Sequence, residues 1–110
     1  MDSEKILLVE DDEVFARVIS RALKQRNFSV LHAQTSDEAL QLAKGSNFAF
    51  GILDLNLGGE TSLNLIPILK KQLPEIRILI LTGYASIATA VEAIKLGADN
   101  YLAKPADADE

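Results

Sequence analysis

The sequence predicts an α/β domain in which helices cover both faces of a parallel β-sheet. Short apolar runs of strand length recur along the chain, and segments with helical periodicity lie between them. Continuously apolar strands that alternate with helices are typical of parallel sheets buried on both faces, with right-handed crossovers. A chain of 110 residues is long enough for one such domain and too short for two.

Five segments have the composition expected of strands. They are rich in aliphatic and aromatic residues, and they comprise residues 6–9, 28–33, 48–53, 76–81 and 101–102. Their apolar runs fall far short of the roughly 20 residues that a membrane-spanning helix needs. The segments therefore predict one open, flavodoxin-like sheet and no contact with a membrane.

Helices are expected between the strands, because apolar residues repeat there with helical spacing. The residues that carry this spacing are Phe15, Val18, Ile19, Ala22 and Leu23 in the first helix and Ile87, Ala90, Val91 and Ile94 in the last. Each of these helices should bury one face against the sheet.

Boundary residues agree with this division. Thr35 followed by Glu38 has the spacing of a capping box, which predicts the start of the second helix. Gly45 stands where that short helix should end. Gly97 is expected to end the last helix. Pro67 lies inside the apolar pattern of the third helix, and proline is harmless only in a first turn. That helix should therefore begin near residues 62–64 or carry a kink.

The composition limits the partners of this segment. Its net charge is -5, whereas clamping nucleic acid phosphates takes clustered lysine and arginine, so contact with DNA would need another domain. The chain has no cysteine, and residues 1–5 lack the features of a signal peptide. A cytoplasmic setting is expected by default.

Polar residues follow the predicted strands. Glu10, Asp11 and Asp12 come after the first strand, and Asp54 comes after the third. The fourth and fifth strands are followed by Thr82 and Lys104. In open parallel sheets the carboxyl ends of the strands meet at one edge, where ligands bind.

Carboxylates gathered at one edge would repel one another unless a cation neutralised them. Mg²⁺, which is bound by one or two carboxylates together with waters and phosphate, fits this arrangement best. A carboxylate such as Asp54 can attack phosphorus and form an aspartyl phosphate. Phosphoryl transfer then requires mainly positioning and neutralised charge, which Mg²⁺, Lys104, the Thr82 hydroxyl and a backbone N–H after Asp54 would provide.

Each of these residues also has a simpler interpretation. Asp12 and Glu13 are at the start of a helix, where acids often only complement the helix dipole. A lone aspartate after a strand is commonly a turn residue, Thr82 could cap a helix, and Lys104 could be a surface lysine. These interpretations do not explain why the set meets at one edge of one sheet.

Four motifs together resemble the signature of two-component response regulator receiver domains. They are Val9-Glu10-Asp11-Asp12, Asp54-Leu55-Asn56-Leu57, Leu81-Thr82-Gly83 and Ala103-Lys104-Pro105. The resemblance runs through all five strands and implies a CheY-like, doubly wound sheet with strand order 2-1-3-4-5. It also implies a signalling switch that is phosphorylated by a histidine kinase.

The resemblance assigns roles to individual residues. It implies metal ligands at Glu10, Asp11, Asp54 and the backbone carbonyl of Asn56, and phosphoryl contacts from Thr82 and Lys104. Tyr101 falls at the position of the switch aromatic, whose ring turns inward when Thr82 moves toward the phosphate. Without the resemblance it would be a half-buried strand residue. Asn56 and Tyr84, two positions after Asp54 and Thr82, should set the lifetime of the phosphate.

The chain departs from the common pattern at two positions. Gly58-Gly59 stands where Pro-Gly is usual, so the loop should be more flexible and still turn. Glu10 replaces the more common aspartate and is expected to reach the ion through water. Neither change removes a reactive group.

The last third of the chain resembles the RegA/PrrA/ActR group of redox-responsive regulators. Its motifs are Leu81-Thr82-Gly83-Tyr84, Ile87-Ala88-Thr89-Ala90-Val91 and Lys104-Pro105-Ala106-Asp107-Ala108-Asp109. The resemblance implies a receiver domain over residues 1–110, a final helix truncated after residues 106–110, and an absent C-terminal DNA-binding domain that controls transcription. An uncovered sheet face would favour a homodimer or segment exchange.

Two rival functions fit parts of the sequence less well. A phosphatase of the haloacid-dehalogenase type has a second Asp two residues after its nucleophile, and Asn56 stands there, so a turnover enzyme is disfavoured. A pure binding module would not need the intact set of Asp11, Asp54, Thr82 and Lys104. His32 lies in a strand pattern, where a structural role is favoured over a phosphocarrier.

Overall fold

The computed structural model describes residues 4–58, 60–82 and 87–103. Five parallel strands form its main sheet: β1 (Lys5–Val9), β2 (Ser29–Ala33), β3 (Phe50–Asp54), β6 (Arg77–Thr82) and β7 (Asn100–Ala103). The helices between them are α1 (Glu13–Gln25), α2 (Ser36–Gly45), α3 (Leu65–Gln72) and α4 (Ile87–Leu96). The predicted alternation of strands and helices is confirmed.

The strands lie side by side in the order β2-β1-β3-β6-β7. This matches the expected order 2-1-3-4-5 once a small antiparallel hairpin is set aside, because that hairpin takes the labels β4 (Asn56–Leu57) and β5 (Glu60–Thr61). The hairpin was not predicted, since strands of two residues leave no periodicity to detect. It follows β3 directly and lies at the carboxyl edge of the sheet.

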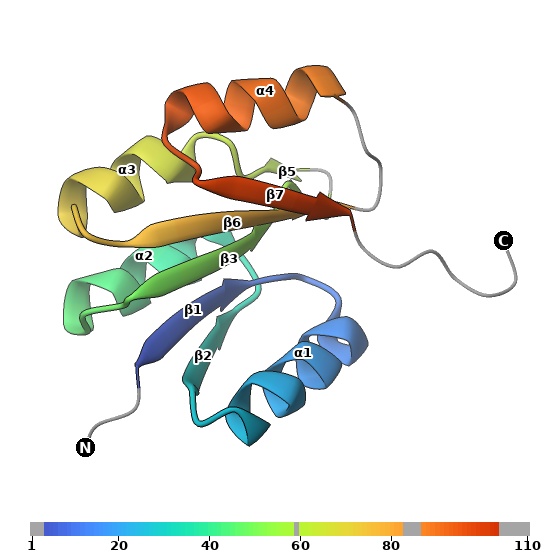
Figure 1. Ribbon diagram of the computed structural model, residues 1–110, viewed down its shortest axis with the longest axis vertical. Coiled ribbons are helices and arrows are strands. Elements are labelled where there is room, and N and C mark those ends of the chain that lie inside the picture. Colours follow the sequence, from blue (N-terminus) through green and yellow to red (C-terminus); the bar gives the residue numbers. More distant parts are fainter. Residues whose placement is uncertain (1–3, 59, 83–86, 104–110) are drawn as a thin grey trace, which may run out of the picture.

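Side chains alternate between two separate clusters along each inner strand. In β1, Leu7 and Val9 face the first cluster, whereas Ile6 and Leu8 face the second. Figure 1 shows α1 on one side of the sheet and α2 and α3 on the other. Because both faces of the sheet are buried, the sequences of these strands are apolar at consecutive positions.

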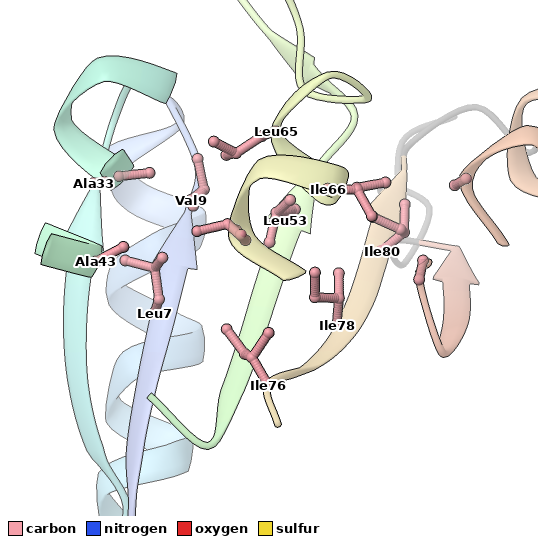
Figure 2. Close-up of a cluster of buried hydrophobic side chains, with 14 of the residues drawn as sticks. Leu7, Val9, Ala33, Ala43, Leu53, Leu65, Ile66, Ile76, Ile78 and Ile80 are labelled. Carbon is pink, nitrogen blue, oxygen red and sulfur yellow. The ribbon is translucent and has the colours of Figure 1, made fainter. Parts of the chain in front are cut away.

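The first cluster is the larger. It joins residues of α2, α3 and α4 to the sheet, and Figure 2 shows its centre, where Leu53, Ile66, Ile78 and Ile80 pack together. Among the described residues, α1 is the one helix that contributes to the second cluster. An apolar groove of about 250 Å³ lies beside α1 on this face of the sheet. It is lined mainly by Leu23, Phe28, Phe50, Ile52 and Leu79.

Helix boundaries agree closely with the sequence. Pro67 is the third residue of α3, in its first turn, so the helix has no need of a kink. Thr35 caps α2 by accepting a hydrogen bond from the Glu38 N–H (3.1 Å), but the Glu38 carboxylate reaches one residue further than a capping box requires and accepts from the Gln34 N–H (2.6 Å). Gly97 follows α4 with a φ of 124°, a conformation that favours glycine.

Candidate phosphoacceptor and metal site

Three carboxylates meet at the carboxyl edge of the sheet. Glu10 and Asp11 directly follow β1, and Asp54 is the last residue of the neighbouring strand β3. One oxygen from each carboxylate lies within 4.8 Å of the other two. The parallel register of β1 and β3 brings these residues together, as the sequence predicted.

The burial of these acids differs. Glu10 is 1% exposed and Asp54 is 6% exposed, whereas Asp11 is open to solvent. Ionised carboxylates this close together repel one another, and a bound cation would neutralise that repulsion. A set of three carboxylate oxygens suits a hard divalent cation, and the exposure of Asp11 leaves a path for it to enter.

Glu10 is held by its surroundings on β2 and α1. Its carboxylate accepts a hydrogen bond from the Asp12 N–H (3.1 Å), and its carbonyl oxygen lies 2.6 Å from Nε2 of His32. Its own N–H donates to the Ala33 carbonyl (2.9 Å). The contact between His32 and a backbone carbonyl agrees with the structural role expected for this histidine.

Asp12 belongs to the helix and not to the three-carboxylate cluster. It is the N-cap of α1, and its Oδ1 accepts from the N–H groups of Val14 (3.0 Å) and Phe15 (3.1 Å). Glu13 lies in the first turn, and its carboxylate accepts from the side-chain amide of Gln34 (2.8 Å). The simpler interpretation of these two acids therefore holds.

The hairpin after β3 contributes backbone groups to the site. The Asn56 N–H donates to Oδ1 of Asp54 (3.2 Å), so a backbone donor lies beside this carboxylate. Gly58 has a φ of 62°, in the left-handed region that favours glycine. A Cβ built at Gly58 would lie 3.4 Å from Oδ2 of Asp11.

Sequence reasoning missed Ser62, which follows the hairpin. Its side chain is fully buried, and its hydroxyl donates to the backbone carbonyl of Asp54 (2.6 Å). A serine in a loop after two glycines is an ordinary turn residue by composition. Its burial becomes visible only once the hairpin folds back on β3.

Two further predicted site residues are placed by the backbone of the sheet. Thr82 ends β6, where Leu81 pairs with Asp54 and Thr82 itself pairs with Ala103. Tyr101 lies in β7 and is 40% exposed, so its side chain is more open to solvent than a half-buried strand residue. Lys104 and Tyr84 lie outside the described residues, as does the predicted truncated helix.

Among the described residues, no helix has the length and apolar composition that crossing a bilayer requires.

Comparisons with known proteins agree on one family. The family model described as response regulator receiver domain matches residues 6–110. The photosynthetic apparatus regulatory protein RegA of Cereibacter sphaeroides is 42% identical over 105 residues, which cover 96% of this chain and 57% of RegA. The acid tolerance regulatory protein ActR of Sinorhizobium medicae is 42% identical over 107 residues, which cover 97% of this chain and 55% of ActR. The predicted likeness to the RegA and ActR group is confirmed, and the chain spans little more than half the length of these relatives.

Solved structures show the same fold. A response regulator from Burkholderia pseudomallei, whose structure holds a phosphorylated aspartic acid, a calcium ion and citrate, is 50% identical with a TM-score of 0.90, covering 97% of this chain and 63% of that one. A CheY-like receiver domain protein from Methanospirillum hungatei is 27% identical with a TM-score of 0.89, covering 96% and 85%. By its sequence, its sheet order and these likenesses, the chain belongs to the family of response regulator receiver domains.

Proposed function

We propose that this receiver domain is a phosphorylation switch that accepts a phosphoryl group on Asp54 from a histidine kinase. The observation that carries the proposal is the meeting of Glu10, Asp11 and Asp54 within 4.8 Å at the carboxyl edge of the sheet. Asp54 is the member that ends the central strand, and it already accepts a backbone hydrogen bond from Asn56.

Mg²⁺ is the metal that we propose for this site. Asp11 and Asp54 would hold it directly, Glu10 through water, and the backbone carbonyl of Asn56 would be a further ligand. When bound, the ion supplies positive charge for the phosphoryl oxygens. The calcium ion in the Burkholderia pseudomallei protein supports the proposal, because Ca²⁺ and Mg²⁺ both prefer oxygen ligands.

In the transfer step, a carboxylate oxygen of Asp54 attacks phosphorus and forms a new P–O bond. The P–N bond to the phosphohistidine of the kinase breaks, and the histidine leaves with the electron pair. The Thr82 hydroxyl and the Lys104 ammonium group are proposed to contact the equatorial oxygens, and the Asn56 N–H supports the carboxylate. Their task is positioning and charge neutralisation.

Transmission of the signal is proposed to use Thr82 and Tyr101. Thr82 ends β6 and Tyr101 lies on the adjacent strand β7, so a shift at one strand end has a short path to the other. The phosphate can shift the equilibrium between two states only by its differential affinity for them. Asn56 and Tyr84 would set how slowly the aspartyl phosphate hydrolyses, so the domain is a slow self-resetting switch and not a turnover enzyme.

The output is proposed to be transcriptional control through a C-terminal DNA-binding domain, in the cytoplasm. The names of RegA and ActR describe regulatory proteins, and both are longer than this chain. A homodimer is also part of the proposal, because the apolar groove beside α1 offers a surface that association would cover. Light scattering that finds a clean monomer at high concentration would count against the dimer.

The phosphorylation is tested by ³¹P NMR with a small phosphodonor such as phosphoramidate. We expect a new acyl phosphate resonance that requires Mg²⁺ and disappears on adding hydroxylamine, which cleaves acyl phosphates. A resonance that resists hydroxylamine, or none at all in the folded protein, would contradict the proposal.

A further inference from the structure

We propose that Ser62 is a positioning residue for the phosphoacceptor, because its buried hydroxyl fixes the peptide group that follows Asp54. The inference rests on the function proposed for Asp54. It assigns a role to a side chain that carries no charge and does not belong to the carboxylate cluster.

Ser62 closes the base of the hairpin with two hydrogen bonds. Its backbone N–H donates to the carbonyl of Leu55 (3.0 Å), and its hydroxyl donates to the carbonyl of Asp54 (2.6 Å). The side chain is 0% exposed, so water cannot replace the hydroxyl as a donor. A buried carbonyl that loses its partner is destabilised, which favours rotation of the peptide toward another donor.

The peptide group between Asp54 and Leu55 is held at its other end as well. The Leu55 N–H donates to the carbonyl of Leu81 on β6 (3.2 Å). The hairpin thus holds the oxygen of this peptide, and the neighbouring strand holds its nitrogen. Both bonds together fix the plane of the peptide.

This plane helps to set the direction of the Asp54 side chain. Rotation about the Cα–C bond of Asp54, the torsion ψ, relates this plane to the Cα–Cβ bond, so a fixed plane restricts the direction in which the side chain leaves the strand. The next peptide carries the Asn56 N–H, which donates to Oδ1 of Asp54 (3.2 Å). A rotated Asp54–Leu55 peptide would therefore move both the carboxylate and its donor relative to Glu10 and Asp11.

Removing the hydroxyl alone separates this role from closing the hairpin. Ser62→Ala keeps the Cβ and the backbone N–H bond to Leu55, and it deletes only the donor to Asp54. We expect the Kd for Mg²⁺ to rise and the rate constant of phosphorylation by phosphoramidate at saturating Mg²⁺ to fall, each by about five- to tenfold, the size of one buried hydrogen bond.

Two control variants test whether a lost hairpin hydroxyl or a lower stability would by itself reduce Mg²⁺ affinity and the phosphorylation rate. Thr61→Ala removes an exposed hydroxyl on the same hairpin, which accepts from the Leu63 N–H (3.2 Å). Ile78→Val deletes one methyl group from the buried core at the far end of β6 and lowers stability without touching the site. Both variants are expected to keep the Kd for Mg²⁺ and the phosphorylation rate within about twofold of the unmodified chain, because neither loses a buried hydrogen bond at the site.

The experiment compares these variants of the full chain by Mg²⁺ titration, single-turnover phosphorylation and denaturant unfolding. Wild-type kinetics and Mg²⁺ affinity in folded Ser62→Ala would overturn the inference and leave the proposed function intact. An equal loss in Ile78→Val would also overturn it, because stability alone would then explain the effect. An unmodified chain that takes no phosphoryl group would overturn the proposed function, and this inference with it.

Should Ser62→Ala not fold, Ser62→Cys carries the same test. Its thiol is larger than the hydroxyl and a weaker donor but keeps a hydrogen on this position, so a smaller loss of about two- to fivefold is expected. A cysteine variant that matches the unmodified chain in both Mg²⁺ affinity and phosphorylation rate would contradict the positioning role of the Ser62 hydroxyl.

Discussion

Gly58 lies next to the side chain of Asp11. A Cβ atom added to this glycine would stand 3.4 Å from Oδ2 of Asp11. The hairpin after β3 thus lies next to the loop that follows β1. Its glycine has a φ of 62°, a conformation that costs other residues roughly 1–2 kcal/mol. The turn is therefore part of the site and not only a connection.

Gly58→Ala should lower the free energy of unfolding by about 1 kcal/mol, since alanine must adopt the left-handed conformation. The added methyl group would also occupy space beside Asp11 that a hydrated Mg²⁺ needs. We expect a weaker affinity for Mg²⁺ in a titration followed by calorimetry.

Gly45→Ala is the matched control for this substitution. Gly45 ends α2, and a Cβ added there would meet no atom within 4 Å. Alanine should raise stability by about 0.4–1 kcal/mol and leave Mg²⁺ binding unchanged. Equal effects of both substitutions on Mg²⁺ affinity would contradict the role given to the turn.

Asp11 and Asp12 are adjacent but should respond in opposite ways. Asp12→Ala removes the N-cap of α1 and should cost about 1 kcal/mol of stability. Its Mg²⁺ affinity should stay near that of the unmodified chain. Asp11→Ala should abolish measurable Mg²⁺ binding with little loss of stability, because its carboxylate is exposed.

Urea unfolding and Mg²⁺ titration of the same preparations would measure both effects. Asp12→Asn offers a check on the cap, since asparagine caps helices about as well as aspartate. A loss of Mg²⁺ binding in Asp12→Ala would show that the cap and the metal site are not separate.

The two faces of α3 give a prediction about the core. Leu69 is fully buried in the first cluster, and its neighbour Ile68 is 40% exposed. Leu69→Ala should lower the free energy of unfolding by about 2–5 kcal/mol through lost burial and a cavity. Ile68→Ala should cost much less, about 1 kcal/mol or below. Similar losses at both positions would mean that α3 packs differently.

Much of the fold could be predicted from the sequence because burial on both faces leaves a strong pattern. The run from Ile6 to Val9 is apolar throughout since its side chains fill two cores, and Pro67 is tolerated because it lies in a first turn. Phe48, predicted to start a strand, instead lies buried just before β3. Apolar composition alone does not distinguish a buried loop residue from a strand residue.

The candidate site was predictable where it depends on strand ends, and less so where it depends on the hairpin. Glu10, Asp11 and Asp54 follow from the rule that parallel strands end at one edge. The hydrogen bond from Ser62 to Asp54 spans eight residues and requires a turn that no periodicity announces. Asp12, which the sequence left between two interpretations, is settled by its hydrogen bonds to Val14 and Phe15.

Intact mass spectrometry tests most directly whether Asp54 accepts a phosphoryl group with the help of a divalent metal. The chain would be incubated with phosphoramidate and Mg²⁺, beside Asp54→Asn and a sample with excess chelator. We expect the mass of one added phosphoryl group in the unmodified chain with Mg²⁺, and in neither of the other two. A mass gain that survives Asp54→Asn, or none in the folded, Mg²⁺-loaded chain, would contradict the account.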